Sequence, residues 1–245
     1  MEQVGTENVD GLVNQESPFL NRELGVLKFN ERVLFQVKDE RNPLLERIRF
    51  LNIFHSNLDE FFMKRVGGLQ RQFFANLASL SPDGLTPEEQ LKLIRERVLQ
   101  FNDSISGLLR DSLLKEVQTQ QIHLLTSAEP SEEEKTWATQ FFRDKIFLVL
   151  TPMAVDPGHP FPLISNLSTS LAVSLKVPNE EESLFARIKI PDVFPSWIRI
   201  PNTPIGTERF VSIVEIIKHN LETLFPKMAI QNVMPFRVTR NIDID

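Results

Sequence analysis

The densest group of polar side chains in the sequence is the segment HSNLDE, residues 55–60, which lies inside a stretch with helical periodicity. Residues four apart are neighbours on a helix, so His55 would face the same side as Asp59. Together with Glu60, these two side chains could ligate a metal ion. Exposed helix faces carry such groups far more often as solvated ion pairs, which is the interpretation we favour.

Asn57, in the middle of this segment, is the residue best suited to a nucleotide. Its amide offers two donors and an acceptor, which match the edge of a purine. The plainer alternative is an ordinary surface or interhelical amide. From the residues alone, that alternative is favoured.

Five cations share the same predicted helix and could bind phosphate, because a guanidinium forks onto two oxygens. They are Arg47, Arg49, Lys64, Arg65 and Arg71. The competing interpretation is a set of solvated helix faces, on which these cations balance neighbouring carboxylates such as Glu46. The residues alone favour solvated faces over a phosphate site.

The remaining histidines give weaker indications. Asp156 and His159 stand in a proline-rich segment, where they could ligate a metal or act as an acid–base pair. Such a segment is more often a rigid connector, and we favour that interpretation. His123 and His219 lie near predicted helix ends, where the helix dipole is explanation enough.

The composition narrows the function classes. The chain has 245 residues, with 27 Lys and Arg against 33 Asp and Glu, and a net charge of −6. This acidic balance argues against general nucleic-acid binding, which needs a basic surface. Cysteine is absent, which excludes disulfides, thiolate metal sites and a cysteine nucleophile. No P-loop or G-x-G-x-x-G motif occurs, and we expect neither an export signal nor a transmembrane segment.

The polar residues of the first half must be positioned by helices. After a loose lead-in over 1–20, apolar spacing predicts one helix over 21–38 and a long one from 44 to about 77, bent near Gly67 and Gly68. Asn42 is the expected N-cap of the long helix, with Pro43 in its first position. A capping box at Thr86 opens a third helix. Three such helices predict an antiparallel bundle, which we assign to residues 21–127.

The second half, residues 128–245, is predicted to be an α+β head domain with a mostly antiparallel sheet. Eleven of the 16 prolines follow residue 150, and helices tolerate proline poorly. A capping box at Ser131 opens a helix, and the proline-rich segment 151–166 is expected to be irregular. Alternating apolar and polar residues predict strands, and a capped apolar stretch predicts one further helix. The strands are 169–177, 184–190, 208–213 and 233–240, and the helix runs from Ser212 to about 224.

Four blocks of the sequence resemble one family. They are NRELGVLKFNERVL (21–34), RNPLLERIRFLNIFHSNLDEFFMKRVGGLQRQ (41–72), TPMAVDPGHPFPLISNLS (151–168) and FRVTRN (236–241). In this order they resemble the opening half of bacterial polyphosphate kinase, the long-chain type. The resemblance runs from about residue 21 to the end of the chain.

The resemblance implies an enzyme that transfers the terminal phosphate of ATP reversibly to inorganic polyphosphate through a phosphohistidine. It implies a helical N-terminal domain and a head domain here, followed in the family by two catalytic domains. The ATP-contacting asparagine of the family's S-N-L-D-E-F block corresponds to Asn57, which makes the nucleotide interpretation the favoured one. Arg65, two turns further along the helix, is a second candidate, for the phosphate side. ATP and ADP, polyphosphate, a second copy of the chain and the C-terminal catalytic domains are the implied partners.

Two departures from the family qualify these expectations. Gly25 and Val26 stand where the family usually has Ser-Trp, and the chain stops at residue 245, before the catalytic domains. None of the four histidines matches the phosphohistidine block, so we expect no catalytic residue and no metal ligand in this chain. Mg²⁺ is expected for the complete enzyme only.

The isolated chain is therefore expected to be inactive. The complete enzyme is expected in the cytoplasm, where it could also associate peripherally with the inner membrane. The rival hypothesis is a non-catalytic dimerisation or assembly module without nucleotide binding of its own. A nucleic-acid adaptor, using the basic stretch from Arg47 to Arg71, is a third alternative, disfavoured by the net charge.

Overall fold

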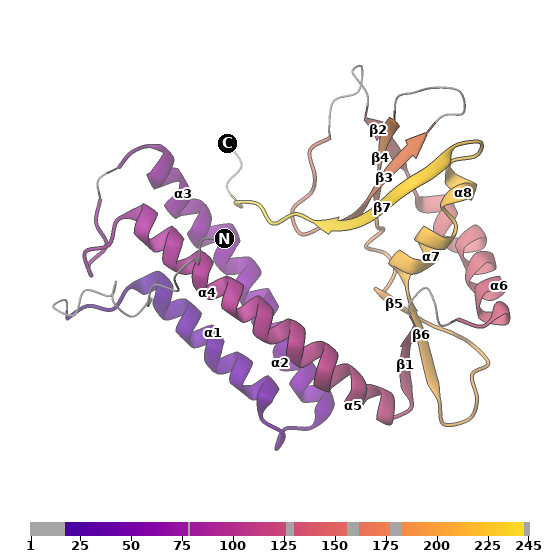
Figure 1. The fold of residues 1–245 in the computed structure, drawn as a ribbon, viewed down its shortest axis with the longest axis horizontal. Coiled ribbons are helices and arrows are strands. Elements are labelled where there is room, and N and C mark those ends of the chain that lie inside the picture. Colours follow the sequence, from indigo (N-terminus) through magenta and orange to yellow (C-terminus); the bar gives the residue numbers. More distant parts are fainter. Residues whose placement is uncertain (1–17, 78, 126–129, 156–161, 177–182, 243–245) are drawn as a thin grey trace, which may run out of the picture. The chain divides into compact units, whose positions relative to one another are not determined.

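The computed structural model describes residues 18–242 except 78, 126–129, 156–161 and 177–182. The chain divides into two units, which are considered separately (Figure 1). The helical unit comprises residues up to 116 together with the segment from 239 onward. The sheet unit comprises residues 117–238. The predicted fold class, a helical N-terminal region followed by an α+β region with a mostly antiparallel sheet, is confirmed.

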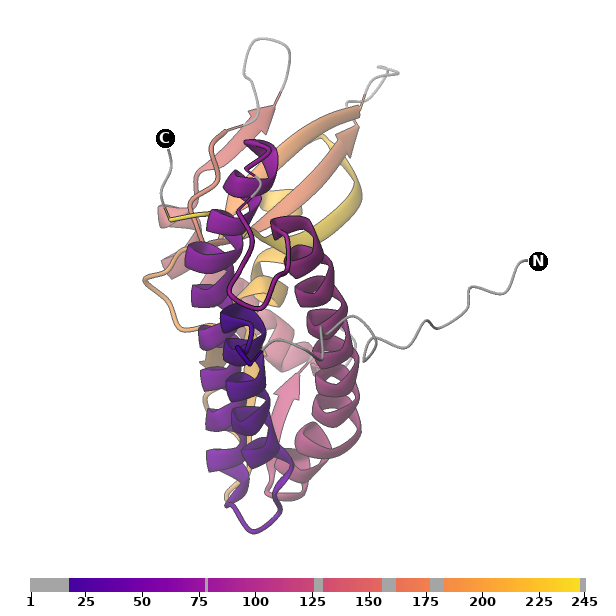
Figure 2. The same cartoon turned by 90° about the vertical axis from the view of Figure 1, so that its left-hand side faces the viewer.

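The helical unit is a bundle in which α1 lies against both α2 and α4, and α3 packs against α4 (Figure 2). Its helices are α1 (Arg22–Lys38), α2 (Leu44–Phe61), the π turn η2 (Phe62–Val66), α3 (Gly67–Phe74), α4 (Pro87–Leu108) and the π turn η3 (Leu109–Leu113), followed by α5 (Leu114–Thr119), which runs into the sheet unit. Apolar side chains from α1, α2 and α4 fill the core, where the Phe54 and Phe101 rings meet edge to face, 5.4 Å apart. Burial of this apolar stripe holds the helices together.

Local signals explain two of the helix starts. The predicted capping box at Thr86 is present: its hydroxyl accepts from the backbone N–H of Glu89, whose carboxylate accepts from the N–H of Thr86. Asn21, which the sequence analysis did not single out, caps α1 through its Oδ1. The same Asn21 amide donates to Asp83 and to Gln90, and all three side chains are buried. Asn21 therefore anchors the start of α1 to the segment that leads into α4.

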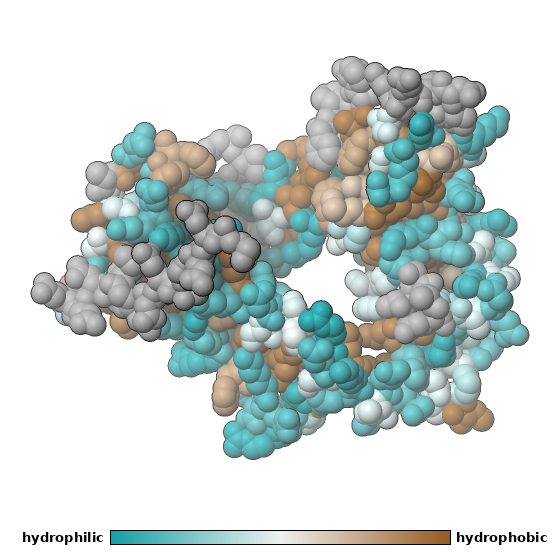
Figure 3. All heavy atoms as spheres, viewed as in Figure 1, coloured by the Kyte–Doolittle hydropathy of each residue, from teal (hydrophilic) through white to brown (hydrophobic). Residues whose placement is uncertain are grey.

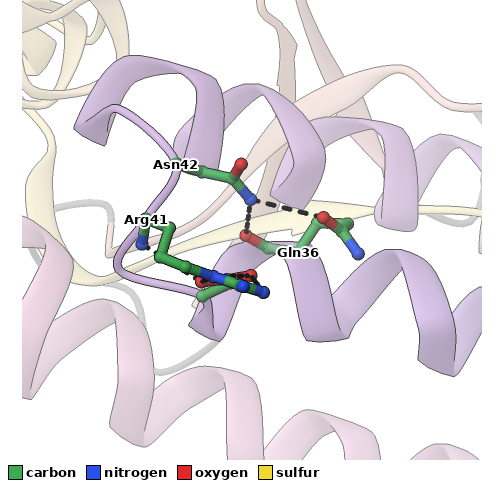
Figure 4. A network of polar contacts seen from close by, with 4 residues as sticks. Gln36, Arg41 and Asn42 are labelled. Carbon is green, nitrogen blue, oxygen red and sulfur yellow. Dashed lines mark hydrogen bonds and ion pairs between the residues drawn. The ribbon is translucent and has the colours of Figure 1, made fainter.

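The prediction that Asn42 is the N-cap of α2 is wrong. The cap position is occupied by Pro43, which makes no side-chain hydrogen bond to the helix. Asn42 Nδ2 instead donates backward to the carbonyl oxygen of Gln36 (3.0 Å) and to Gln36 Oε1 (3.3 Å), while Arg41 binds Asp39 (Figure 4). The last carbonyls of a helix have no partner within the helix, and Asn42 satisfies one of them at the end of α1.

The long predicted helix contains a π turn directly before the glycines where the sequence predicts a bend. From Leu44 to Phe74 the chain is helical throughout, and the π turn η2 ends at Val66, next to Gly67. The N–H of Gly67 bonds to the carbonyl of Phe62, five residues back. A π turn inserts one extra residue into a helix, and this shifts the register of everything that follows.

The sheet unit contains two small sheets and a set of helices that cover them (Figure 1). Its elements are β1 (Ile122–Leu125), α6 (Glu132–Phe141), the π turn η4 (Phe142–Ile146), the 3-10 turn η5 (Phe147–Val149), β2 (Pro152–Val155), β3 (Thr169–Lys176), β4 (Ser183–Lys189), β5 (Trp197–Arg199), β6 (Glu208–Ser212), α7 (Ile213–His219), α8 (Leu221–Leu224) and β7 (Ala229–Arg237). One sheet has the order β1-β6-β5, with β1 and β6 parallel; the other, β2-β4-β3-β7, is antiparallel throughout.

The expectation of irregular structure over 151–166 is wrong at its start. Residues 152–155 form β2, which pairs with β4 in the register Met153 to Arg187. Pro152 is the first residue of this edge strand, a position where the missing N–H is tolerated. Residues 156–161 lie outside the described part of the chain.

Candidate functional site

The candidate site lies where α1 and α2 pack against each other, and Asn57 is its central residue. Asn57 is partly buried, and its Nδ2 donates to Asn30 Oδ1 on α1 at 3.1 Å. Asn30 is buried, and its own Nδ2 donates to the backbone carbonyl of Phe54 at 3.0 Å. Asn57 is therefore held by a neighbour that is itself fixed to the backbone.

A second polar pair joins α1 to the π turn η2, which continues α2. Arg65 Nη1 lies 3.2 Å from Glu23 Oε1, with side chains 30% and 13% exposed. The other carboxylate oxygen of Glu23, Oε2, is buried and has no hydrogen-bond partner among the described residues. Arg65 thus reaches the site with its charge already balanced by Glu23.

The two pairs, Asn57–Asn30 and Arg65–Glu23, form what we call the α1–α2 seam. Arg65 follows Asn57 by eight residues, whereas Asn30 follows Glu23 by seven. Seven residues make two turns of an α-helix, and a π turn accommodates one residue more. Because η2 includes Arg65, the eight residues from Asn57 to Arg65 span the same two turns as the seven from Glu23 to Asn30. Both pairs can therefore form between the same two stretches of chain.

The other polar residues of the HSNLDE segment do not join the seam. His55 is exposed, and its ring meets that of Phe54 edge to face at 5.5 Å. Glu60 forms an ion pair with Lys64, and this pairing lowers the pKa of the Glu60 carboxyl. Among residues 18–242, gaps excepted, no cluster of three or more His, Asp or Glu side chains could hold a metal ion.

The five cations differ in their surroundings. Arg47 is buried, and it donates to the carbonyl of Val37 and to Glu116 at 2.6 Å, so it joins α2 to α1 and α5 rather than lying on a solvated face. A hydrogen bond from Ser112 is the main cause that lowers the pKa of Glu116, with a contribution from Arg47 against the opposing effect of burial. Arg49 is an exposed partner of Glu46, as the solvated-face interpretation expects.

The histidines outside the segment are dispersed. His219 ends α7, where the helix dipole favours it, whereas His123 lies in β1. Asp156 and His159, the candidate acid–base or metal pair, lie outside the described residues.

Asn30 and Glu23, which hold the two candidate residues, were not predicted from the sequence. Asn30 occupies the same apolar stripe of α1 as Leu27 and Leu34 and is as buried as they are. A polar side chain on a core stripe needs a buried partner, so this spacing was the available signal. Glu23 gave no comparable signal, because acidic residues are common in the first turn of any helix.

Most of the chain is similar to two domains of known proteins. Residues 19–125 match the family model of the polyphosphate kinase N-terminal domain, and residues 133–245 match that of the polyphosphate kinase middle domain. A polyphosphate kinase from Synechocystis is 46% identical over 237 residues, and one from Mycobacterium marinum is 43% identical over 236 residues. These alignments cover 92% and 94% of the chain and 32% of each relative.

A solved structure shares the fold as well. The polyphosphate kinase from Porphyromonas gingivalis superposes with a TM-score of 0.82 at 29% identity, over 94% of this chain and 34% of that one. The chain belongs to the polyphosphate kinase family, and it carries that family's N-terminal and middle domains. It spans about a third of the length of the relatives that it matches.

Proposed function

We propose that this chain is the N-terminal portion of a polyphosphate kinase and supplies one wall of its ATP site, with Asn57 in contact with the nucleotide. In this proposal the enzyme transfers the terminal phosphate of ATP reversibly to inorganic polyphosphate. The phosphohistidine and the Mg²⁺ site belong to other domains of the enzyme. Contacts with a second copy of the chain are part of the same proposal.

The observation that carries this proposal is the state of the Asn57 amide. It is partly exposed and anchored through Nδ2 to Asn30, and its Oδ1 has no hydrogen-bond partner among the described residues. An anchored amide with a spare acceptor is preorganised to bind a ligand, because little side-chain entropy is lost on binding.

Arg65 is the second candidate, for the phosphate side of the nucleotide. It lies two helical turns from Asn57, and a guanidinium is well suited to phosphate oxygens. Its ion pair with Glu23 must be shared or broken for this to happen. Asn57 is therefore the better-supported contact.

Replacement of Asn57 by alanine in the complete gene product tests the proposal. We expect Asn57→Ala to weaken ATP binding by about tenfold, the loss of one well-placed hydrogen bond, and to leave polyphosphate binding nearly unchanged. Asn52→Ala is the matched control, because Asn52 is an exposed asparagine of the same helix. An equal loss of both ligands would show that Asn57 is structural.

A second candidate function is an assembly module that binds no nucleotide by itself. The observation in its favour is that α1 exposes two large apolar side chains, Phe29 and Phe35. Figure 3 shows apolar patches, in brown, among mainly hydrophilic side chains. Sedimentation with and without ATP discriminates the two: a dimer without measurable nucleotide binding favours the module.

No described helix has both the length and the apolar character needed to span a membrane.

A further inference from the structure

The positions of the oxygen and nitrogen in the Asn57 side-chain amide follow from its hydrogen-bond partners. Asn30, which contacts Asn57, is itself bound to the backbone. The carbonyl oxygen of Phe54 can only accept a hydrogen bond, so the Asn30 atom 3.0 Å from it must be the amide nitrogen. Asn30 is only 2% exposed, so water cannot compete for this bond. The Oδ1 of Asn30 is therefore held pointing away from the Phe54 carbonyl.

The contact between Asn30 and Asn57 then fixes the orientation of the Asn57 amide. Because Asn30 Oδ1 accepts, the Asn57 atom at 3.1 Å must be a donor, which is Nδ2. Asn57 therefore keeps Oδ1 and one remaining N–H for other partners. A reversed Asn57 amide would set two oxygens against each other beside the buried Asn30, which costs a hydrogen bond and leaves a buried acceptor unpaired.

We propose that Asn30 is a positioning residue that fixes the direction of the Asn57 amide and makes the site select adenine over 6-oxopurine nucleotides. The inference rests on the proposed contact between Asn57 and the nucleotide. Adenine presents an exocyclic amine, a donor, beside a ring nitrogen that accepts. An asparagine amide pairs with such an edge through its oxygen and one N–H.

Hypoxanthine and guanine reverse this pattern at position 6. Their carbonyl oxygen would face the Oδ1 of Asn57, so two acceptors would meet unless the amide turned round and gave up Asn30. A site built to pair with a donor rejects an analogue that lacks it, because its polar group is then left unsatisfied. Phosphate oxygens are acceptors too, so the triphosphate cannot supply the donor that Oδ1 needs.

The test compares three triphosphates on the complete gene product by equilibrium competition binding. They are those of adenosine, of purine riboside, which has hydrogen at position 6, and of inosine, which has the carbonyl. We expect affinity to fall in that order, with inosine triphosphate about tenfold or more weaker than ATP. Equal affinity for ATP and inosine triphosphate would overturn the inference, and it would leave the Asn57 contact standing if Asn57→Ala still weakened both.

Asn30→Ala tests the positioning role itself. With the anchor removed, the Asn57 amide is free to turn, so the ratio of the two affinities should fall toward one while circular dichroism reports a folded protein. Asn52→Ala should keep the ratio of the unmodified protein. A folded Asn30→Ala protein with undiminished selectivity would overturn the role of Asn30. If Asn57→Ala changed no nucleotide affinity, the proposed function would fail and this inference with it.

Discussion

Each residue proposed to face ATP is held by a residue of α1: Asn57 by Asn30 and Arg65 by Glu23. These two interactions differ: one is a hydrogen bond between amides and the other is an ion pair. Asn30 gives Asn57 a direction and leaves an acceptor for a ligand, whereas Glu23 neutralises the charge that would make Arg65 useful. At this scale the seam therefore favours a contact with the base over a contact with phosphate.

The Arg65–Glu23 pair gives a prediction about anion binding. Glu23→Gln removes the opposing charge and should raise the affinity of the complete gene product for inorganic triphosphate by up to about fivefold, the range of a partly exposed ion pair. Arg65→Gln in the same background should abolish the gain. Affinity that is unchanged in Glu23→Gln would remove Arg65 from the phosphate side of the site.

Asp39 gives a prediction about pH. Hydrogen bonds from the Arg41 side chain and backbone lower the pKa of Asp39 from 3.8 to about 2. Its folded-state pKa is depressed, so the stabilisation is fully present above about pH 4 and is lost as pH falls toward 2. Asp39→Asn should lower the thermal midpoint at pH 6, and the difference from the unmodified protein should shrink between pH 4 and pH 2. A pH-independent difference would contradict this assignment.

At the scale of the element, the π turn η2 has two consequences within the helical unit. It keeps Arg65 opposite Glu23, and the N–H of Gly67 bonds to the carbonyl of Phe62 rather than to that of Met63. The backbone N–H of Ile242 donates to this Met63 carbonyl at 3.1 Å. Residue 242 therefore lies against the π turn that follows α2.

Adjacent glycines make this packing testable. A Cβ on Gly67 would lie 2.7 Å from the Asn241 side chain, whereas one on Gly68 would meet nothing within 4 Å. Both substitutions gain the helix propensity of alanine, about 1 kcal/mol, so their difference isolates the contact. We expect Gly68→Ala to be neutral or stabilising and Gly67→Ala to destabilise by about 1–3 kcal/mol in urea unfolding. Two equal gains would show that the contact is absent in solution.

The elements also show where the sequence sufficed. The caps at Thr86 and Ser131 and the apolar stripes of the long helices are local signals, and the structure confirms them. Strands β1, β2 and β5 were missed because each has only three or four residues, and a short strand is defined by its partner. The Asn30–Asn57 bond joins residues 27 positions apart, so no local pattern could predict it.

At the scale of the whole molecule, the chain carries two of the domains of a polyphosphate kinase and covers 32% of the length of its Synechocystis relative. No described histidine lies at the seam, and the proposed function places the phosphohistidine in other domains of the enzyme. We therefore expect the 245-residue chain, given ATP, Mg²⁺ and polyphosphate, to form neither ADP nor acid-labile phosphohistidine. Robust turnover would contradict the proposal that the catalytic residues belong to other domains of the enzyme.

The central claim is that Asn57 contacts the nucleotide, and a crystal structure of the complete gene product with a non-hydrolysable ATP analogue tests it most directly. We predict that the purine lies within hydrogen-bond distance of the Asn57 amide, with the exocyclic amine toward Oδ1 and the Asn30 bond intact. A bound nucleotide with no atom near Asn57, and the α1–α2 seam unchanged, would contradict the claim.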